Sequence, residues 1–188
     1  MRSVFIAVLF FASLPAQAAD FSDPIPRYER AGGGFACRMS KQDFTQAETE
    51  KRDVCLHIGP LFVGMLRTDA ETLLGKPVTS VPVGTREAFA SQLQSVSTGR
   101  MNTYVVFTYD NDGHADSVQL TGAPWPSAWQ FAGLTLGVAQ TAVTERLGAP
   151  MQTQKSDDPG ATQWSYSPWT FSFEVKDGVV SSIRIAAE

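Results

Sequence analysis

The sequence is poor in the side chains from which metal and nucleophilic sites are built, with two cysteines and two histidines among 188 residues. So few of these residues argue against a Cys/His metal cluster. No positive excess is present either, because 15 Lys and Arg face 19 Asp and Glu, which disfavours a nucleic-acid partner. No Lys-Ser or Lys-Thr follows Gly32-Gly33-Gly34, and no G-x-S-x-G motif occurs. We therefore expect no cofactor and no enzymatic activity.

The sequence also lacks an apolar run of the roughly 20 residues that a membrane-spanning helix needs. Its first apolar run, Val4 to Leu14, is shorter, follows Arg2 and precedes Ala16-Gln17-Ala18. This pattern is typical of a removable export signal over residues 1–18. The position after Ala18 is not a cysteine, so no lipid attachment is expected. The pattern predicts a soluble periplasmic or secreted protein with no membrane insertion after removal of the signal.

Export places the two cysteines, Cys37 and Cys55, in an oxidising compartment, where each has the other as its partner. Residues 40–53 between them indicate a short amphipathic helix capped by Ser40. The alternative, a reactive thiol pair, needs the C-x-x-C spacing that this chain lacks. We therefore predict a structural disulfide. Residues 19–36, with two prolines and three consecutive glycines, are expected to form a flexible arm.

An internal repeat organises the remaining chain. Residues 61–77 align without a gap with residues 134–150, and Leu, Gly, Thr, Leu, Gly and Pro occupy the same positions in both. In each copy a helix of about two turns is expected to end at Gly75 or Gly148, because glycine adopts the positive φ of a helix terminus and a proline follows.

Strand patterns follow each copy of this motif. Residues 103–109 and 116–120 flank an Asp-Gly turn in the first copy, and residues 163–166, 169–175 and 179–187 follow the second. Residues 85–93 are expected to form an additional helix. The sequence therefore predicts an α+β fold of two tandem helix-helix-strand-strand(-strand) repeats, over 37–122 and 123–188, with an antiparallel sheet and helices on one face.

The Gly148-x-Pro150 helix ending, the Trp164-x-Tyr166 strand and the hairpin with Phe171 and Phe173 before Gly178 resemble the SmpA/OmlA (BamE-type) outer-membrane-assembly lipoproteins. Two such units in tandem are similar to the β-lactamase inhibitory proteins. The resemblance covers roughly Ile58 to Ile185. The resemblance implies a tandem-repeat fold. A role in inhibition or envelope assembly follows from it only by analogy between folds.

Two other patterns resemble parts of metal sites. Asp110, Asp112 and Asp116 lie around a hairpin glycine, as acidic residues do in a calcium-binding loop. In such a loop, however, Thr108 and Gln119 would occupy two positions that normally hold strong ligands, and this favours a plain turn. His57 and His114 each lack a third ligand at helical or hairpin spacing. We therefore predict no metal site.

The strand aromatics are the remaining candidates for a functional surface. Because strand side chains alternate between faces, some aromatic residues are expected on an open sheet face, where amphipathic rings often form binding hot spots. The predicted partner-binding residues are Tyr104, Tyr109, Trp164 and Trp169. We expect a non-catalytic module of inhibitor, immunity or envelope-assembly type that binds another exported or cell-envelope protein. The alternative is a periplasmic protein that binds a small molecule or envelope polymer in a cavity between the repeats.

Overall fold

The computed structural model describes residues 26–50, 53–93, 103–124 and 128–187. The predicted export signal, residues 1–18, lies outside the described residues. The described chain begins with a hairpin of β1 (Arg27–Ala31) and β2 (Gly34–Arg38) and the helix α1 (Lys41–Glu50). The two-residue strands β3 (His57–Ile58) and β4 (Leu61–Phe62) then form a small antiparallel pair. No helix among the described residues has the length and apolar character needed to cross a bilayer.

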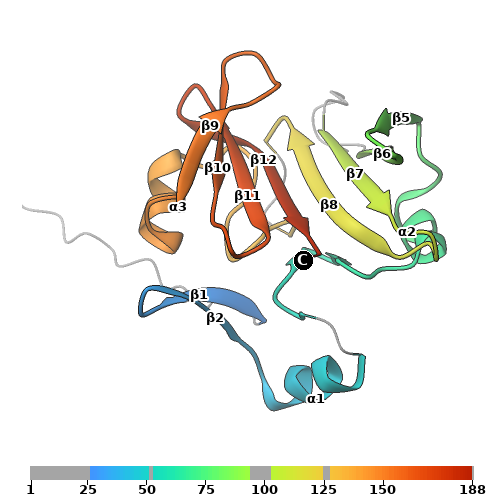
Figure 1. The fold of residues 1–188 in the computed structure, drawn as a ribbon, viewed down its shortest axis with the longest axis horizontal. Helices are drawn as coiled ribbons and strands as arrows, with labels where there is room; N and C mark the ends of the chain where they lie inside the picture. The colour runs from blue at the N-terminus through green and yellow to red at the C-terminus, as the bar shows by residue number, and fades with distance from the viewer. Residues whose placement is uncertain (1–25, 51–52, 94–102, 125–127, 188) are drawn as a thin grey trace, which may run out of the picture.

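One continuous antiparallel sheet of eight strands follows in the order β5-β6-β7-β8-β12-β11-β10-β9 (Figure 1). The helix α2 (Arg67–Leu74) precedes β5 (Thr79–Val83), β6 (Arg86–Leu93), β7 (Thr103–Tyr109) and β8 (Ala115–Gly122). The helix α3 (Gln140–Leu147) precedes β9 (Gln152–Lys155), β10 (Ala161–Ser165), β11 (Phe171–Lys176) and β12 (Val179–Ala186). The last strands of the two sets, β8 and β12, pair at the centre of the sheet. We call β5–β8 and β9–β12 the N-terminal and C-terminal half-sheets.

The predicted α+β fold of two helix-helix-strand repeats is wrong, because the structure is mostly β. Each half-sheet follows one helix of eight residues and contains four strands. Residues 85–93, expected to be helical, instead lie almost entirely in β6, where Phe89 pairs with Phe107 of β7. Gly84, at a φ of 61°, allows the tight turn from β5 into β6. Pairing across the sheet overrides the helix propensity of the Ala- and Glu-containing segment.

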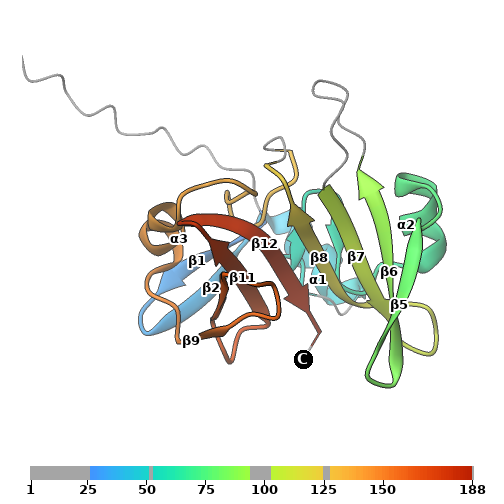
Figure 2. The same ribbon diagram turned by 90° about the horizontal axis from the view of Figure 1, so that it is seen from above.

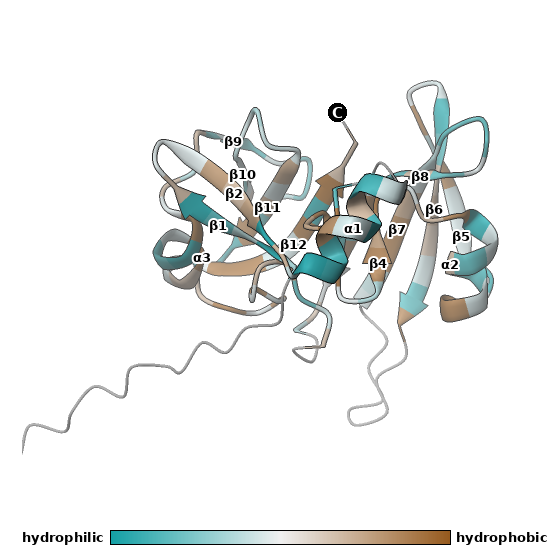
Figure 3. Cartoon of the chain, turned by 90° about the horizontal axis from the view of Figure 1, so that it is seen from below, coloured by the Kyte–Doolittle hydropathy of each residue, from teal (hydrophilic) through white to brown (hydrophobic). Residues whose placement is uncertain are grey.

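The helices α2 and α3 and the two small hairpins lie on one face of the sheet (Figure 2) and contribute to a single core there, so we call this the core face. Figure 3 shows α1 as a largely hydrophilic helix in front of more apolar parts of β4 and β7. Ala70 of α2 and Val143 and Leu147 of α3 are buried in this core. Buried strand residues on the core face come from both half-sheets and include Val105, Phe107, Val118, Leu120, Phe171, Phe173, Ile183 and Ile185. We call the opposite side of the sheet the outer face.

The described part of the expected flexible arm, residues 26–36, is instead an ordered segment that contains β1 and most of β2. Its aromatic residues give the physical reason. The Tyr28 ring lies 5.4 Å from that of Phe171, and the Phe35 ring lies 5.7 Å from that of Tyr166, between centroids. The hairpin therefore belongs to the core of the molecule, because it buries aromatic surface against the C-terminal half-sheet.

The predicted disulfide is confirmed: Cys37 of β2 and Cys55 are bonded, with their Cα atoms 5.7 Å apart. The helix between them is also confirmed as α1, and the Ser40 hydroxyl accepts a hydrogen bond of 3.1 Å from the backbone N–H of Asp43. The disulfide therefore ties the β1–β2 hairpin to the segment that leads into β3.

Candidate ligand-binding cleft

The four aromatic residues predicted to bind a partner do not share one face of the sheet. Tyr104 lies on the outer face, because its neighbour Val105 is fully buried in the core and successive strand residues alternate. Its cross-strand neighbours are Gln92 and Thr121, and Gln92 Nε2 lies 3.5 Å from the Tyr104 hydroxyl. Tyr104 is thus the one member of the set on the outer face.

Tyr109 and Trp164 pack on the core face instead. Tyr109 stacks on Phe107 with ring centroids 5.5 Å apart, and the Arg67 guanidinium lies over the neighbouring Phe89 ring. Burial raises the pKa of Tyr109 to about 12, and Arg67 opposes part of that rise. Trp164 pairs with buried Phe173 across β10 and β11.

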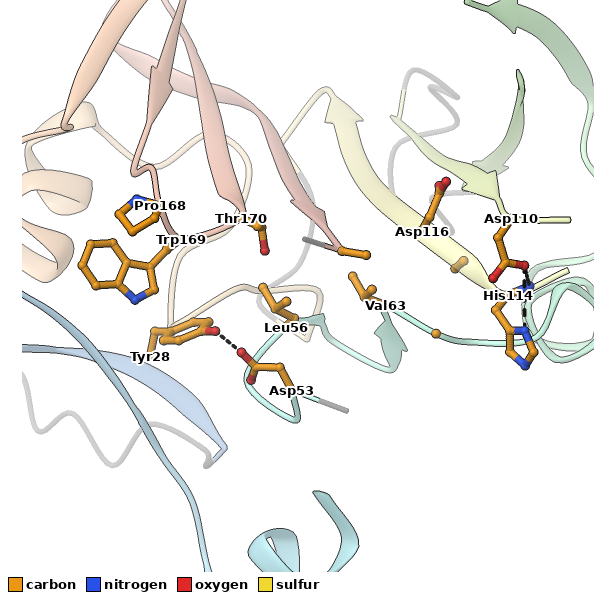
Figure 4. Close-up of a pocket in the computed structure, with 13 residues that line it drawn as sticks. Tyr28, Asp53, Leu56, Val63, Asp110, His114, Asp116, Pro168, Trp169 and Thr170 are labelled. Carbon is orange, nitrogen blue, oxygen red and sulfur yellow. Dashed lines mark hydrogen bonds and ion pairs between the residues drawn. The ribbon is translucent and has the colours of Figure 1, made fainter. Parts of the chain in front are cut away.

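Trp169, the fourth residue, lines a sizeable cleft. This cleft has a volume of about 660 Å³ and lies between the β10–β11 connection and the β7–β8 turn (Figure 4). Its floor comes from the segment around β3 and β4 and from the end of the chain after β12. The lining residues are Tyr28, Asp53, Leu56, Val63, Gly64, Asp110, His114, Ala115, Asp116, Pro168, Trp169, Thr170 and Ala187.

Aromatic side chains form one end of the cleft. The Trp169 and Tyr28 rings both line the cleft there (Figure 4). Behind Trp169, the Phe35 ring meets it edge-on with centroids 4.9 Å apart, and the Trp169 backbone N–H donates to the Tyr166 carbonyl. The β1–β2 hairpin therefore supports this aromatic wall from the side away from the cleft.

Asp53 lies at the same end, beneath Tyr28 (Figure 4). Its Oδ1 accepts the backbone N–H of Cys55 at 2.8 Å, and its Oδ2 accepts the hydrogen of the Tyr28 hydroxyl. The disulfide at Cys55 thus also fixes the position of a carboxylate that faces the aromatic wall.

The β7–β8 turn supplies the polar end of the cleft. Asp110 Oδ1 accepts backbone N–H groups from His114 at 2.8 Å and Asp112 at 3.0 Å, and these hydrogen bonds, that from His114 most of all, lower the pKa of Asp110. The His114 Nδ1 atom lies 3.8 Å from Asp110 Oδ1. Asp116 accepts a hydrogen bond from the Thr108 hydroxyl and forms an ion pair with Arg86.

Backbone hydrogen bonds hold the floor between the two ends. The Gly64 N–H donates to the Ala115 carbonyl at 2.7 Å, and the Ala115 N–H donates to the Met65 carbonyl at 2.8 Å. The Ala187 N–H donates to the Asp116 carbonyl at 2.7 Å. Three segments that are distant in the sequence are thereby joined, so the cleft is preformed rather than assembled from mobile loops.

The two histidines lie in different places. His114 is at the cleft, whereas His57 is held between two backbone carbonyls, with Nδ1 3.0 Å from the Gly59 oxygen and Nε2 2.8 Å from the Pro26 oxygen. Among the described residues, one group of three potential metal ligands comes together, Cys37, Asp53 and Cys55. Its two sulfurs are bonded to one another and so are not free thiolates.

Sequence reasoning missed most of this cleft. Tyr28 fell within the expected arm, and Asp53 marked only the end of an expected helix. Leu56 and Val63 carry no signal beyond hydrophobicity. The predicted disulfide is the one sequence feature that placed residues near 37 beside residues near 55, and no pattern placed either beside residues 110–116 or 168–170.

Comparisons with known proteins give little further guidance. No family model matches the chain, and no curated protein matches it. A solved structure of a DUF4309 family protein (YjgB) from Bacillus subtilis is similar over 65% of this chain and 78% of that chain, with 14% sequence identity and a TM-score of 0.45.

Proposed function

We propose that this chain is an exported, non-catalytic binding protein that holds a small molecule or a short stretch of an envelope polymer in the cleft between its half-sheets. The observation that carries the proposal is the cleft itself, in which an aromatic wall faces acidic side chains across an apolar floor. A volume of about 660 Å³ is within the range of small-ligand sites, which combine apolar walls with a few fixed polar groups.

Two features support the exported location, periplasmic or secreted. The pattern of residues 1–18 predicts an export signal, and the Cys37–Cys55 disulfide is typical of oxidising compartments. The same disulfide lies next to Asp53 and so links the redox environment to the geometry of the cleft.

A ligand panel read by thermal unfolding tests the proposal. The panel contains sugars, amino acids, amines and phospholipid headgroup fragments. A ligand that binds only the folded state raises its stability by about 2.7 kcal/mol at a hundredfold excess over Kd. We expect at least one member to give a saturable rise in melting temperature.

Two variants near the two ends of β12 test whether the stabilising ligand binds in the cleft. Ala187 is exposed and lines the cleft, so Ala187→Phe fills it without disturbing the core. Val179 is exposed at the opposite end of β12, so Val179→Phe is the control. Stabilisation should persist in Val179→Phe and disappear in Ala187→Phe. Equal stabilisation of both variants, or none by any panel member, would contradict the proposal.

Recognition of another exported or cell-envelope protein through the outer face is the second candidate. It is favoured by exposed Val81 and Val83 on β5, which lie on the same face as Tyr104. Under this candidate, Val81→Lys abolishes capture of the partner from an envelope extract, whereas Ala187→Phe leaves capture intact. Unchanged capture of the partner by Val81→Lys, together with loss of capture by Ala187→Phe, would exclude this candidate.

A further inference from the structure

The cleft is acidic at both of its ends. The described residues that line it include three aspartates and one histidine but no lysine or arginine. Asp53 lies at the aromatic end beside Tyr28, and Asp110 and Asp116 come from the turn at the other end (Figure 4). A ligand that spans the cleft therefore meets negative charge at two separate places.

The balance of charge differs among the three carboxylates. Arg86 pairs with Asp116, so that charge is compensated by the protein itself. No lysine or arginine within the described ranges forms an ion pair with Asp53 or Asp110. Asp110 is also held in its charged form, because backbone N–H groups lower its pKa. Among the described residues, each end of the cleft thus has one carboxylate without a lysine or arginine partner.

These carboxylates do not form a site for a single metal ion. Within the part of the chain that is described, Asp110, His114 and Asp116 do not bring three ligand atoms within 4.8 Å of one another, and neither do they with Asp53. The separation of the acids instead suits a ligand whose positive charges are themselves separated.

The surface between the two ends is apolar. Leu56, Val63, Gly64, Ala115 and Ala187 line it, and backbone hydrogen bonds already occupy the N–H groups of the last four. Such a floor offers van der Waals contact to methylene groups and little to the hydroxyl groups of a sugar.

We infer that the ligand of this cleft is an extended aliphatic dication of the alkyl diamine or polyamine class. One ammonium group lies between Asp53 and the Trp169 ring, where a carboxylate and an aromatic ring attract the same cation. The methylene chain lies along the floor, and the second ammonium group meets Asp110. This inference rests on the proposed function, since it names the ligand class of the same cleft.

Titration calorimetry on the mature protein tests the inference. The probes are α,ω-diamines with three to eight methylene groups, spermidine, the monoamine of matched length and the diol of matched length. We expect one diamine length or spermidine to bind at least tenfold more tightly than the matched monoamine, with no heat from the diol. Asp53→Asn and Asp110→Asn should each weaken diamine binding about tenfold, whereas Asp157→Asn, on an exposed loop away from the cleft, should not.

The outcomes separate this inference from the function on which it rests. Equal affinity for monoamine and diamine would overturn the inference of a dication. Unchanged diamine affinity in an Asp110→Asn variant that retains the circular dichroism of the original protein would do the same. A neutral fragment could bind instead, with no amine bound and with binding abolished in Ala187→Phe. That result would overturn the inference of a dication but leave the cleft as a ligand site. Absence of binding by every probe would overturn both.

Discussion

The Trp169 indole lies directly against Gly34, so closely that a Cβ atom at Gly34 would be 2.3 Å from both Cη2 and Cζ2 of the ring. Non-bonded carbon atoms do not approach one another that closely. The β1–β2 hairpin thus approaches the β10–β11 connection through a position that only glycine can occupy. This contact sets the orientation of the aromatic wall of the cleft.

Gly34→Ala is therefore expected to destabilise the protein by about 1–3 kcal/mol, the usual cost of forcing an extra methyl group into a packed site. Urea unfolding followed by tryptophan fluorescence measures the loss. The displaced indole should also shift the emission maximum of the folded state and weaken binding of any cleft ligand.

Gly33→Ala is the matched control, because a Cβ atom at Gly33 meets nothing within 4 Å. Its free energy of unfolding should change little. Equal losses in the two variants would show that hairpin flexibility, rather than the contact with Trp169, explains the requirement for glycine.

Replacement of both Cys37 and Cys55 by serine is expected to lower the free energy of unfolding by about 3 kcal/mol, the chain-entropy value for a loop of this size. Chemical denaturation of the oxidised protein and of the double variant measures the difference. Intact mass after alkylation without reductant gives an independent check. Two alkylated thiols in the exported protein would contradict the structural disulfide.

Stability is expected to fall in strong alkali because of two phenols, the buried Tyr166 and the partly buried Tyr109. Burial raises the pKa of Tyr109 and of Tyr166, each to about 12. The folded state holds these protons more tightly than the unfolded chain, whose tyrosines titrate near 10, so their contribution is present below about pH 10 and is lost as the pH rises through 12.

Absorbance at 295 nm and unfolding free energies between pH 9 and pH 12 test this expectation. Tyr109→Phe should remove part of the alkaline decline. Tyr166→Phe should also lower stability at neutral pH by about 1 kcal/mol, because the Tyr166 hydroxyl donates to the Gly148 carbonyl at 2.9 Å. Titration of both phenols near pH 10 in the folded protein would contradict the account.

Tyr104 and Trp169 are expected to separate the two candidate functions. Tyr104→Ala changes only the outer face, so binding of a cleft ligand should be unaffected, whereas Trp169→Leu should weaken it about tenfold by removing the ring that lines the cleft. Calorimetry with the tightest panel ligand measures both. Loss of ligand binding in Tyr104→Ala, with Trp169→Leu unaffected, would place the site on the outer face.

Local signals predicted several elements well. Residues 103–109 are all β-branched or aromatic and form β7, and Asp177-Gly178 forms the turn between β11 and β12, with φ angles of 52° and 78°. Gly75 and Gly148 end α2 and α3 at φ angles of 79° and 80°, as expected from the Gly-x-Pro pattern. In these places the residue type itself restricts the backbone.

The rest depended on contacts between distant residues. Phe89, Ser91 and Leu93 alternate toward the core only because β7 pairs with β6, and the same residues fit a helix in isolation. Every residue of the edge strands β5 and β9 is exposed, so neither strand shows an alternation of buried and exposed positions. The cleft combines residues near 28, 53, 110 and 169, which the disulfide and the β8–β12 pairing bring together.

An NMR titration of the isotope-labelled protein with the ligand panel tests the central claim most directly. The account predicts that at least one ligand, and a diamine or spermidine first, shifts the backbone amides of Gly64, Ala115, Thr170 and Ala187 in a saturable manner while amides around Tyr104 stay unchanged. Saturable shifts confined to the outer face, or none at the four cleft amides with any ligand, would contradict it.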